Sequence, residues 1–181
     1  MRAIVLSAAA AVLVGACAAP APPARPLGSD GQPATVVYRI SQGDLPRVQF
    51  RALDAVNTLR AANGVPALQL NAQLNAAAAT QSRDMSAQGR PWHFGSDGSS
   101  PVDRVRRAGY GGRLLGEVIS ETFESELETI TAWMQERDTR NVLLDPAARD
   151  MGLGFHQDPN GKLWWTLVTG APEAGSQLAS F

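Results

Sequence analysis

Residues 151–169 read MGLGFHQDPNGKLWWTLVT, two apolar stretches separated by a turn. Asp158-Pro-Asn-Gly161 combines residue types that favour tight turns, so it predicts a hairpin between strands at Met151–Gln157 and Lys162–Thr169. In the second strand Trp164 and Trp165 must face opposite sides of the sheet. One is expected in the core, and the other either covers a helix or lines a groove for lipid.

Several segments before this hairpin in the sequence have helical patterns. Asp44 is expected to cap a helix over Leu45–Asn63, and Asn71 to begin a second helix that Gly89 ends. The inner positions expected of the first helix are Phe50, Leu53, Val56 and Leu59, and those of the second are Leu74, Ala78, Gln81 and Met85.

Two further helices and a third strand follow. Ser100 and Pro101 predict a short helix that stops at Gly109, and Arg113–Ile119 has the composition of a strand. Thr122 is expected to cap the next helix. Its buried positions are expected to be Leu127, Ile130, Trp133 and Met134. Helices around a small, largely antiparallel sheet give a mixed α+β fold.

The N-terminus carries an export signal. Residues 1–16 join Arg2 to an apolar run too short to span a membrane. The run ends at Cys17, the only cysteine, in a pattern that resembles the lipobox of bacterial lipoproteins. We therefore expect an exported protein of the cell envelope whose partner is the lipid bilayer, held through lipidated Cys17. The alternative is an ordinary signal peptide, which would give a secreted protein.

The remaining chain divides by composition. Residues 17–40 are rich in Ala and Pro and predict a tether, 41–170 form the domain, and 171–181 form a small, polar tail. The formal charge of −1 and the lack of a basic run argue against nucleic acid as a partner.

Glu117 is the first candidate for chemistry. Strand alternation places it on one face with Leu115 and Ile119, where a carboxylate needs a cation, a hydrogen-bond partner or a metal. His93, between Trp92 and Phe94, is the natural candidate. The aromatics are expected to pin the loop to the core.

Simpler interpretations remain open at each of these positions. His93 on its own fits a histidine at the edge of the core, Glu136 fits a solvated charge at a helix end, and His156 fits a surface residue. The familiar local motifs of hydrolases and nucleotide-binding proteins are absent from the sequence. A triad from Ser96, His93 and Asp97 is disfavoured, because neighbouring loop residues rarely converge in the required geometry.

A series of short motifs resembles the CAP superfamily of cysteine-rich secretory proteins, antigen 5 and plant pathogenesis-related proteins, in its compact bacterial form. The resemblance runs from about Leu53 to Gly170 and rests on the order of these motifs. They are Asn57-x-x-Arg60, Leu68-x-Leu70-Asn71, Ala77-Ala78-x-x-x-Ser82-x-x-Met85, His93 with Asp97-Gly98, Gly109-Tyr110, Gly116-Glu117, Trp133, Arg140, Leu143-Leu144 and Gly152-x-Gly154.

The resemblance implies an α-β-α sandwich with a cleft that carries two histidines and two acids, able in some members to hold a divalent metal. His93 and Glu117 match the first histidine and the first acid, and Glu136 matches the second acid. Thr139 stands where the family's second histidine is expected. Such a site, with His93 and Glu117 as the metal ligands, would bind a divalent cation only weakly.

The resulting expectation is a non-enzymatic CAP-domain protein whose cleft binds a small ligand, such as a lipid, a cation or a peptide. The alternative is a metal-assisted hydrolase that acts on envelope or extracellular substrates, with Glu117 as general base. A third interpretation treats the tethered domain as an envelope scaffold with an unused cleft.

Overall fold

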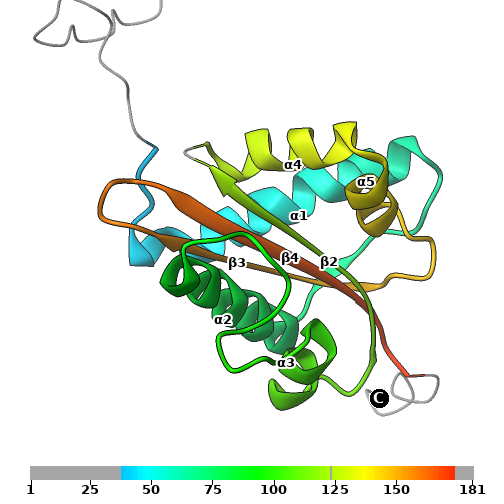
Figure 1. The fold of residues 1–181 in the computed structure, drawn as a ribbon. Helices are drawn as coiled ribbons and strands as arrows, with labels where there is room; N and C mark the ends of the chain where they lie inside the picture. The colour runs from blue at the N-terminus through cyan, green and yellow to red at the C-terminus, as the bar shows by residue number, and fades with distance from the viewer. Residues whose placement is uncertain (1–37, 123, 174–181) are drawn as a thin grey trace, which may run out of the picture. The chain divides into compact units, whose positions relative to one another are not determined.

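The structure is a computed structural model that describes residues 38–122 and 124–173 (Figure 1). The expected signal sequence, Cys17 and most of the expected tether and tail lie outside these residues. Within the described part of the chain, no helix is both long and apolar enough to cross a membrane.

The sheet has four strands in the order β1-β3-β4-β2. The expected hairpin is formed by β3 (Asp150–Gln157) and β4 (Leu163–Ala171), and β2 (Arg113–Thr122) pairs antiparallel with the other side of β4. These pairings confirm a largely antiparallel sheet. The two-residue strand β1 (Gln69–Leu70) runs parallel to β3 and was not predicted, because it is too short to show alternation.

Helices cover both faces of this sheet, so the expected α-β-α sandwich is confirmed (Figure 1). On one face lie α1, α4 and α5, and on the other lie α2 and α3. The helices are α1 (Leu45–Ala62), α2 (Ala72–Gln88), α3 (Pro101–Arg107), α4 (Glu126–Gln135) and α5 (Arg137–Leu143), and a 3₁₀ turn, η1 (Gln42–Asp44), precedes α1.

The two tryptophans of β4 are buried on opposite faces, which confirms the core-and-cover interpretation. Trp165 belongs to the larger apolar cluster, with residues of α1 and α4. Trp164 alternates with Thr166, whose hydroxyl accepts a hydrogen bond from Ser82 of α2. Trp164 therefore lies beneath α2 and does not line an open groove.

Helix α2 packs directly on the backbone of β3. A Cβ atom built on Gly152 would lie 2.1 Å from the Leu74 carbonyl carbon, and one on Gly154 would lie 2.1 Å from the Ala79 backbone nitrogen. Only glycine leaves room for this approach. Asn71 caps α2 as expected, since its side chain accepts from two backbone N–H groups, and Gly89 ends the helix.

The inner face of α1 matches the expectation in part, because Val56 is buried and Leu53 and Leu59 pack against the core, but Phe50 does not. Phe50 is 63% exposed, whereas Val48, Ala52 and Val56 are fully buried. Arg60 is buried on the same face and donates to four backbone carbonyl groups, those of Pro66, Leu143, Asp145 and Ala148. Hydrophobicity alone ranked Phe50 above Ala52, but small residues and this arginine select the inner face.

The cap of α1 lies at Asp44 as expected but lacks the side-chain hydrogen bond, and the cap of α4 was placed wrongly. Asp44 accepts hydrogen bonds from Ser41 and does not cap α1 with its side chain. Thr122 ends β2, and Ser125 caps α4 in a reciprocal capping box with Glu128. Ile130 and Trp133 are buried as expected, whereas Leu127 is 45% exposed and Thr129 is buried in its place.

The folded domain includes residues that we placed in the tether. Tyr38 and Ile40 pack against the larger apolar cluster. The Tyr38 hydroxyl donates to the carboxylate of Glu126, at 2.9 Å. Residues 38–40 are therefore part of the folded domain.

Candidate functional site

The loop that carries His93 is held through its backbone. Side-chain nitrogens of Gln81, Arg104 and Gln88 donate to the carbonyl oxygens of residues 92, 93 and 94 respectively. The aromatic anchors expected here are only partly realised, because Phe94 is 46% exposed. The loop is fixed by hydrogen bonds to α2 and α3, and Phe94 was wrongly assigned to the core.

A tight turn follows the histidine, as the glycine-rich sequence predicted. The Gly98 amide donates to the Gly95 carbonyl at 2.9 Å, and Gly98 has a φ of +76°, which favours glycine. The Gly95 amide donates in turn to the Ser99 carbonyl at 2.9 Å. This closed turn leads directly into the Ser100 cap of α3.

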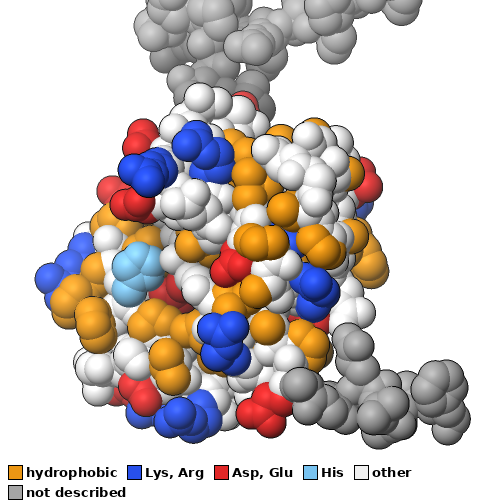
Figure 2. Space-filling view, turned by 90° about the vertical axis from the view of Figure 1, so that its right-hand side faces the viewer, with side chains coloured by type: hydrophobic (Ala, Val, Ile, Leu, Met, Phe, Trp, Pro, Cys, Tyr) orange, Lys and Arg blue, Asp and Glu red, His pale blue; other side chains and the backbone are white. Residues whose placement is uncertain are grey.

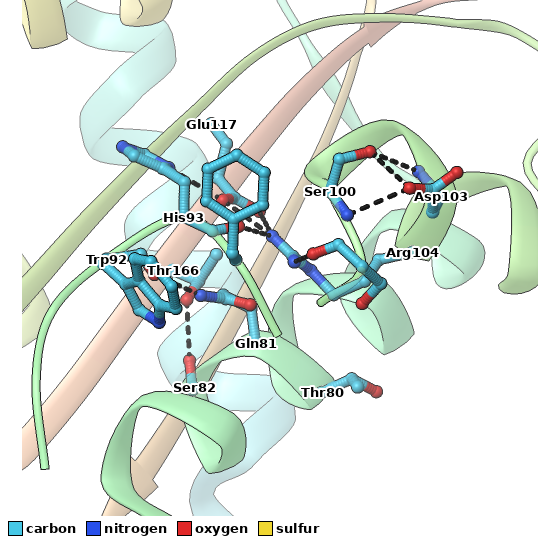
Figure 3. Close-up of polar contacts among 12 residues, drawn as sticks. Thr80, Gln81, Ser82, Trp92, His93, Ser100, Asp103, Arg104, Glu117 and Thr166 are labelled. Carbon is cyan, nitrogen blue, oxygen red and sulfur yellow. Dashed lines mark hydrogen bonds and ion pairs between the residues drawn. The ribbon is translucent and has the colours of Figure 1, made fainter. Parts of the chain in front are cut away.

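His93 and Glu117 lie together, as Figure 3 shows. His93 Nδ1 is 2.9 Å from Glu117 Oε1. The two side chains differ sharply in exposure, 47% for His93 and 3% for Glu117. The histidine therefore presents its outer edge to solvent, while the carboxylate lies below it.

Arg104 of α3 is the main charge partner of Glu117. Its Nη2 atom donates to both carboxylate oxygens, at 2.9 and 2.8 Å, and its side chain is 3% exposed. Arg104 Nη1 also donates to the Ser99 carbonyl at 3.1 Å. A buried carboxylate that is hydrogen-bonded to a guanidinium is neutralised within the protein.

Sequence reasoning had missed Arg104. It required a cation or hydrogen-bond donor for Glu117 but considered only His93. The available signal was the phase of α3, because the Ser100–Asp103 capping box fixes where the helix starts and which side of it faces the sheet. Arg104 precedes the buried Val105, whereas Arg107 is exposed and pairs with Asp97.

A bulge changes the face that Glu117 shares. The register of β2 against β4 shifts between Leu114 and Gly116, so Leu115 is an extra residue. Leu115 packs with the larger cluster and Leu114 with the smaller one on the α2 side. The expected pairing of Leu115 with Glu117 on one face was wrong, because a bulge interrupts the alternation.

An open groove of about 700 Å³ lies beside the His93–Glu117 pair. One wall is formed by residues 91–93, the floor by residues 117–121 of β2, and the other wall by Asp138, Thr139 and Val142 of α5. Five consecutive residues of one strand thus contact the same groove.

The structure separates the two other expected tetrad positions. Thr139 lines the groove, but its hydroxyl donates to the carbonyl oxygens of Trp133 and Glu136 near the end of α4. Glu136 is exposed at the junction of α4 and α5 and is not among the groove-lining residues. Asp138 supplies a carboxylate to the groove instead.

The residues brought together here do not fit a metal ion. Both oxygens of Glu117 already accept from Arg104, and one imidazole remains as the other donor. Within the described ranges, no group of three or more His, Cys, Asp or Glu side chains is placed to hold one. His156, the other histidine, lies on β3, where its side chain is 39% exposed and its Nε2 is 3.6 Å from Oδ1 of Asp158 in the following turn.

Comparisons with known proteins identify the family of this chain. The family model described as "Cysteine-rich secretory protein family" (CAP) matches residues 53–169, more than half of the chain. A Bacillus subtilis protein, YkwD, described as uncharacterized, is 25% identical over 114 residues, which are 63% of this chain and 44% of that protein. The match thus spans less than half of that relative.

Two solved structures share the fold. An extracellular protein from Bacillus anthracis that contains an SCP domain superposes with a TM-score of 0.65 at 19% identity, over 74% of this chain and 45% of that one. An outer surface protein of Borrelia burgdorferi superposes with a TM-score of 0.64 at 13% identity, over 76% of this chain and 100% of that one. These likenesses show the shared fold, and the family model over residues 53–169 shows that this chain belongs to the CAP, or cysteine-rich secretory protein, family.

Proposed function

We propose that this protein is a non-enzymatic, exported CAP-domain protein that binds a small ligand or peptide in the groove beside His93, without a metal ion. The observation that carries the proposal is the ion pair of Glu117 with Arg104. It removes the charge that would otherwise attract a divalent cation. The groove offers His93 as an exposed hydrogen-bonding group beside apolar and backbone surface.

Glu117 is poorly suited to act as a general base. A base needs a lone pair within reach of the proton that it removes, and both carboxylate oxygens are buried against Arg104. Two hydroxyl groups, those of Ser120 and Thr139, lie among the groove-lining side chains. The Thr139 hydroxyl donates to helix carbonyls, and no described contact joins Ser120 to His93 or Glu117. This arrangement favours binding over the metal-assisted hydrolase.

The groove also favours a partly polar ligand over a bulk lipid surface. On the face that Figure 2 shows, apolar side chains form several small groups separated by acidic, basic and other polar surface. A domain that inserts into a bilayer needs a contiguous apolar patch. The bilayer contact in this proposal is therefore made through lipidated Cys17, and the groove remains in water.

Export is supported by the sequence of residues 1–17 and by the structural relatives, which are described as extracellular and outer surface proteins. A lipidated Cys17 would hold the domain at the cell envelope. An unmodified Cys17 would leave it secreted.

The test is a fragment and peptide screen by amide NMR on the full chain, carrying Cys17→Ser, in EDTA. The expected hits shift the amide signals of residues 91–93 and 117–121. Thr139→Trp fills the groove and is expected to abolish their binding, whereas Thr131→Trp, at an exposed position of α4, is expected to preserve it. Hits that bind Thr139→Trp and Thr131→Trp equally would refute the groove as the binding site. Turnover of a hydrolysable hit, lost in Glu117→Gln, would establish the enzyme instead.

A further inference from the structure

β2 is the edge strand of the sheet next to the groove. It pairs with β4 on one side and has no strand on the other among the described residues. An edge strand presents every second backbone N–H and C=O group away from the sheet.

The hairpin identifies which residues of β2 face outward. The Asp158 amide donates to the Lys162 carbonyl, so even-numbered residues of β4 direct their backbone groups toward β3 and odd-numbered ones toward β2. Residues 163, 165, 167 and 169 pair with residues 122, 120, 118 and 116. The outward-facing backbone groups are therefore those of Glu117, Ile119 and Glu121.

A side-chain contact agrees with this assignment. Trp133 Nε1 donates to the Ile119 carbonyl at 3.2 Å, which requires that carbonyl to face away from β4. For the amides of Glu117, Ile119 and Glu121, no backbone partner outside the β2–β4 pairing is found within the described chain. Among the described residues, these three N–H groups and the carbonyls of Glu117 and Glu121 have no partner beyond the edge of β2, so they could pair with a ligand.

The groove follows this edge rather than one face of the sheet. Its floor comprises residues 117–121 without a gap, although successive side chains of a strand point to opposite faces. All five residues can line one groove only if the groove runs along the backbone edge of β2. At about 3.3 Å per residue the edge is about 16 Å long, the length of five extended residues.

The groove-lining residues also set the charge of the ligand. They include the acids Glu117, Glu121 and Asp138 and no lysine or arginine. Glu117 is neutralised by Arg104, and Glu121 has a longer contact with Lys162, at 3.4 Å. Asp138 is exposed and forms no ion pair among the described residues. The rim is therefore acidic near Asp138 and Glu121.

We infer that the groove binds an extended peptide segment that adds a strand to the free edge of β2 and places a lysine or arginine side chain near Asp138 and Glu121. This inference rests on the proposed function and specifies its ligand. Main-chain hydrogen bonds to Glu117, Ile119 and Glu121 would supply affinity, and the acidic rim would supply selectivity. The His93 loop and α5 would flank the bound strand.

The experiment uses the full chain with Cys17→Ser and two libraries of capped hexapeptides, one with a fixed lysine and one with a fixed glutamate. The expected binders come from the lysine library and bind at least tenfold more tightly than those of the glutamate library. Hydrogen exchange with the best binder is expected to protect the amides of Glu117, Ile119 and Glu121. Preference for glutamate, or no protection of these amides, would overturn the inference.

The ligand itself provides a second test. In an added strand, alternate residues direct their N–H groups to β2, so N-methylation of one alternate set is expected to weaken binding at least tenfold. N-methylation of the other set is expected to leave binding nearly unchanged. Equal effects of the two sets would overturn strand addition while the groove remained a binding site.

Variants of the protein test the same contacts. Ile119→Pro removes one outward N–H, which an edge strand tolerates, and is expected to weaken binding while circular dichroism stays native. Asp138→Lys is expected to weaken binding, whereas Asp54→Lys, an exposed acid on α1, is expected to have no effect. If Ile119→Pro unfolds the chain, the N-methylated peptides still test whether the ligand adds a strand to β2.

The failures of the two proposals are distinguishable. If no peptide binds, but a non-peptide fragment binds in the groove and Thr139→Trp abolishes its binding, the inference fails and the proposed function stands. If neither peptides nor fragments bind the groove, both fail.

Discussion

Arg104 and Glu117 form a buried ion pair between α3 and the edge strand β2, in which one guanidinium nitrogen contacts both carboxylate oxygens at 2.9 and 2.8 Å. The same nitrogen donates to the His93 carbonyl at 2.9 Å. One arginine thus both neutralises the carboxylate and positions the loop that carries the histidine.

Removing this arginine should destabilise the fold. Arg104→Met leaves the Glu117 carboxylate buried without its cation, which costs about 3–5 kcal/mol of unfolding free energy. The double variant Arg104→Met/Glu117→Leu should lose clearly less than the sum of the single variants, because it leaves no unpaired charge. Urea unfolding measures all of these values.

Arg107→Met is the matched control, because the Arg107–Asp97 pair is more than half exposed on both sides. It should lower the free energy of unfolding far less than Arg104→Met, because solvent screens an exposed ion pair. Equal losses for Arg104→Met and Arg107→Met would show that the buried pair does not stabilise the site.

The close approach of α2 to β3 predicts a strong effect of one methyl group. Gly154→Ala places a Cβ atom within 2.1 Å of the α2 backbone, which cannot move without shifting the helix. We expect a loss of about 3 kcal/mol or more. Gly111→Ala is the control, because its Cβ meets no atom within 4 Å. A loss of less than about 1 kcal/mol at Gly154 would contradict the packing.

Tyr110 should make stability fall at high pH. Burial, followed by its hydrogen bond to Asp150 and the charge of that residue, raises the pKa of the Tyr110 hydroxyl above its usual value near 10. The stability that this raised pKa contributes to the folded state is fully present below pH 10. Above pH 10 the unfolded chain loses this proton while the folded chain keeps it, so stability falls as pH rises.

The comparison with Tyr110→Phe isolates this contribution. At pH 7 the variant should lose about 1–3 kcal/mol of unfolding free energy. The buried Asp150 carboxylate keeps its hydrogen bond from the Gln69 side chain but loses the one from the Tyr110 hydroxyl. Between pH 9 and 11 the urea midpoint of the unmodified chain should fall more steeply than that of the variant. Parallel curves would contradict the pKa shift.

Lipid anchoring predicts a change of compartment. Cys17→Ser should move the protein from the membrane fraction to the soluble fraction of its host, because the acyl chains are lost. Cell fractionation with immunoblotting measures the distribution. A variant that remained membrane-bound would contradict anchoring through Cys17.

Much of the fold was predictable because its signals are local. The turn at residues 158–161 and the caps at Asn71 and Ser100 were assigned from a few adjacent residues, and the structure confirms them. The start of α4 was missed because Thr122 and Ser125 are both cap residues. Only the partner Glu128, three residues later, distinguishes them.

The candidate site was predictable in part. The contact of His93 with Glu117 was expected because a buried carboxylate needs a partner and because of the family resemblance, and the structure places these side chains 2.9 Å apart. The bulge at Leu115 and the role of Arg104 depend on contacts between distant segments, which periodicity does not reveal. The acid opposite the pair was assigned to Glu136, whereas the break between α4 and α5 brings Asp138 to the groove.

The central claim is that Arg104 takes the place of a metal ion beside Glu117, and calorimetric titration of Zn²⁺, Mg²⁺ and Ca²⁺ into the full chain with Cys17→Ser tests it most directly. The claim predicts no saturable binding that depends on His93, so the titrations of the native sequence and of His93→Ala should coincide. One-site binding of any of the three ions that disappears in His93→Ala would contradict the claim.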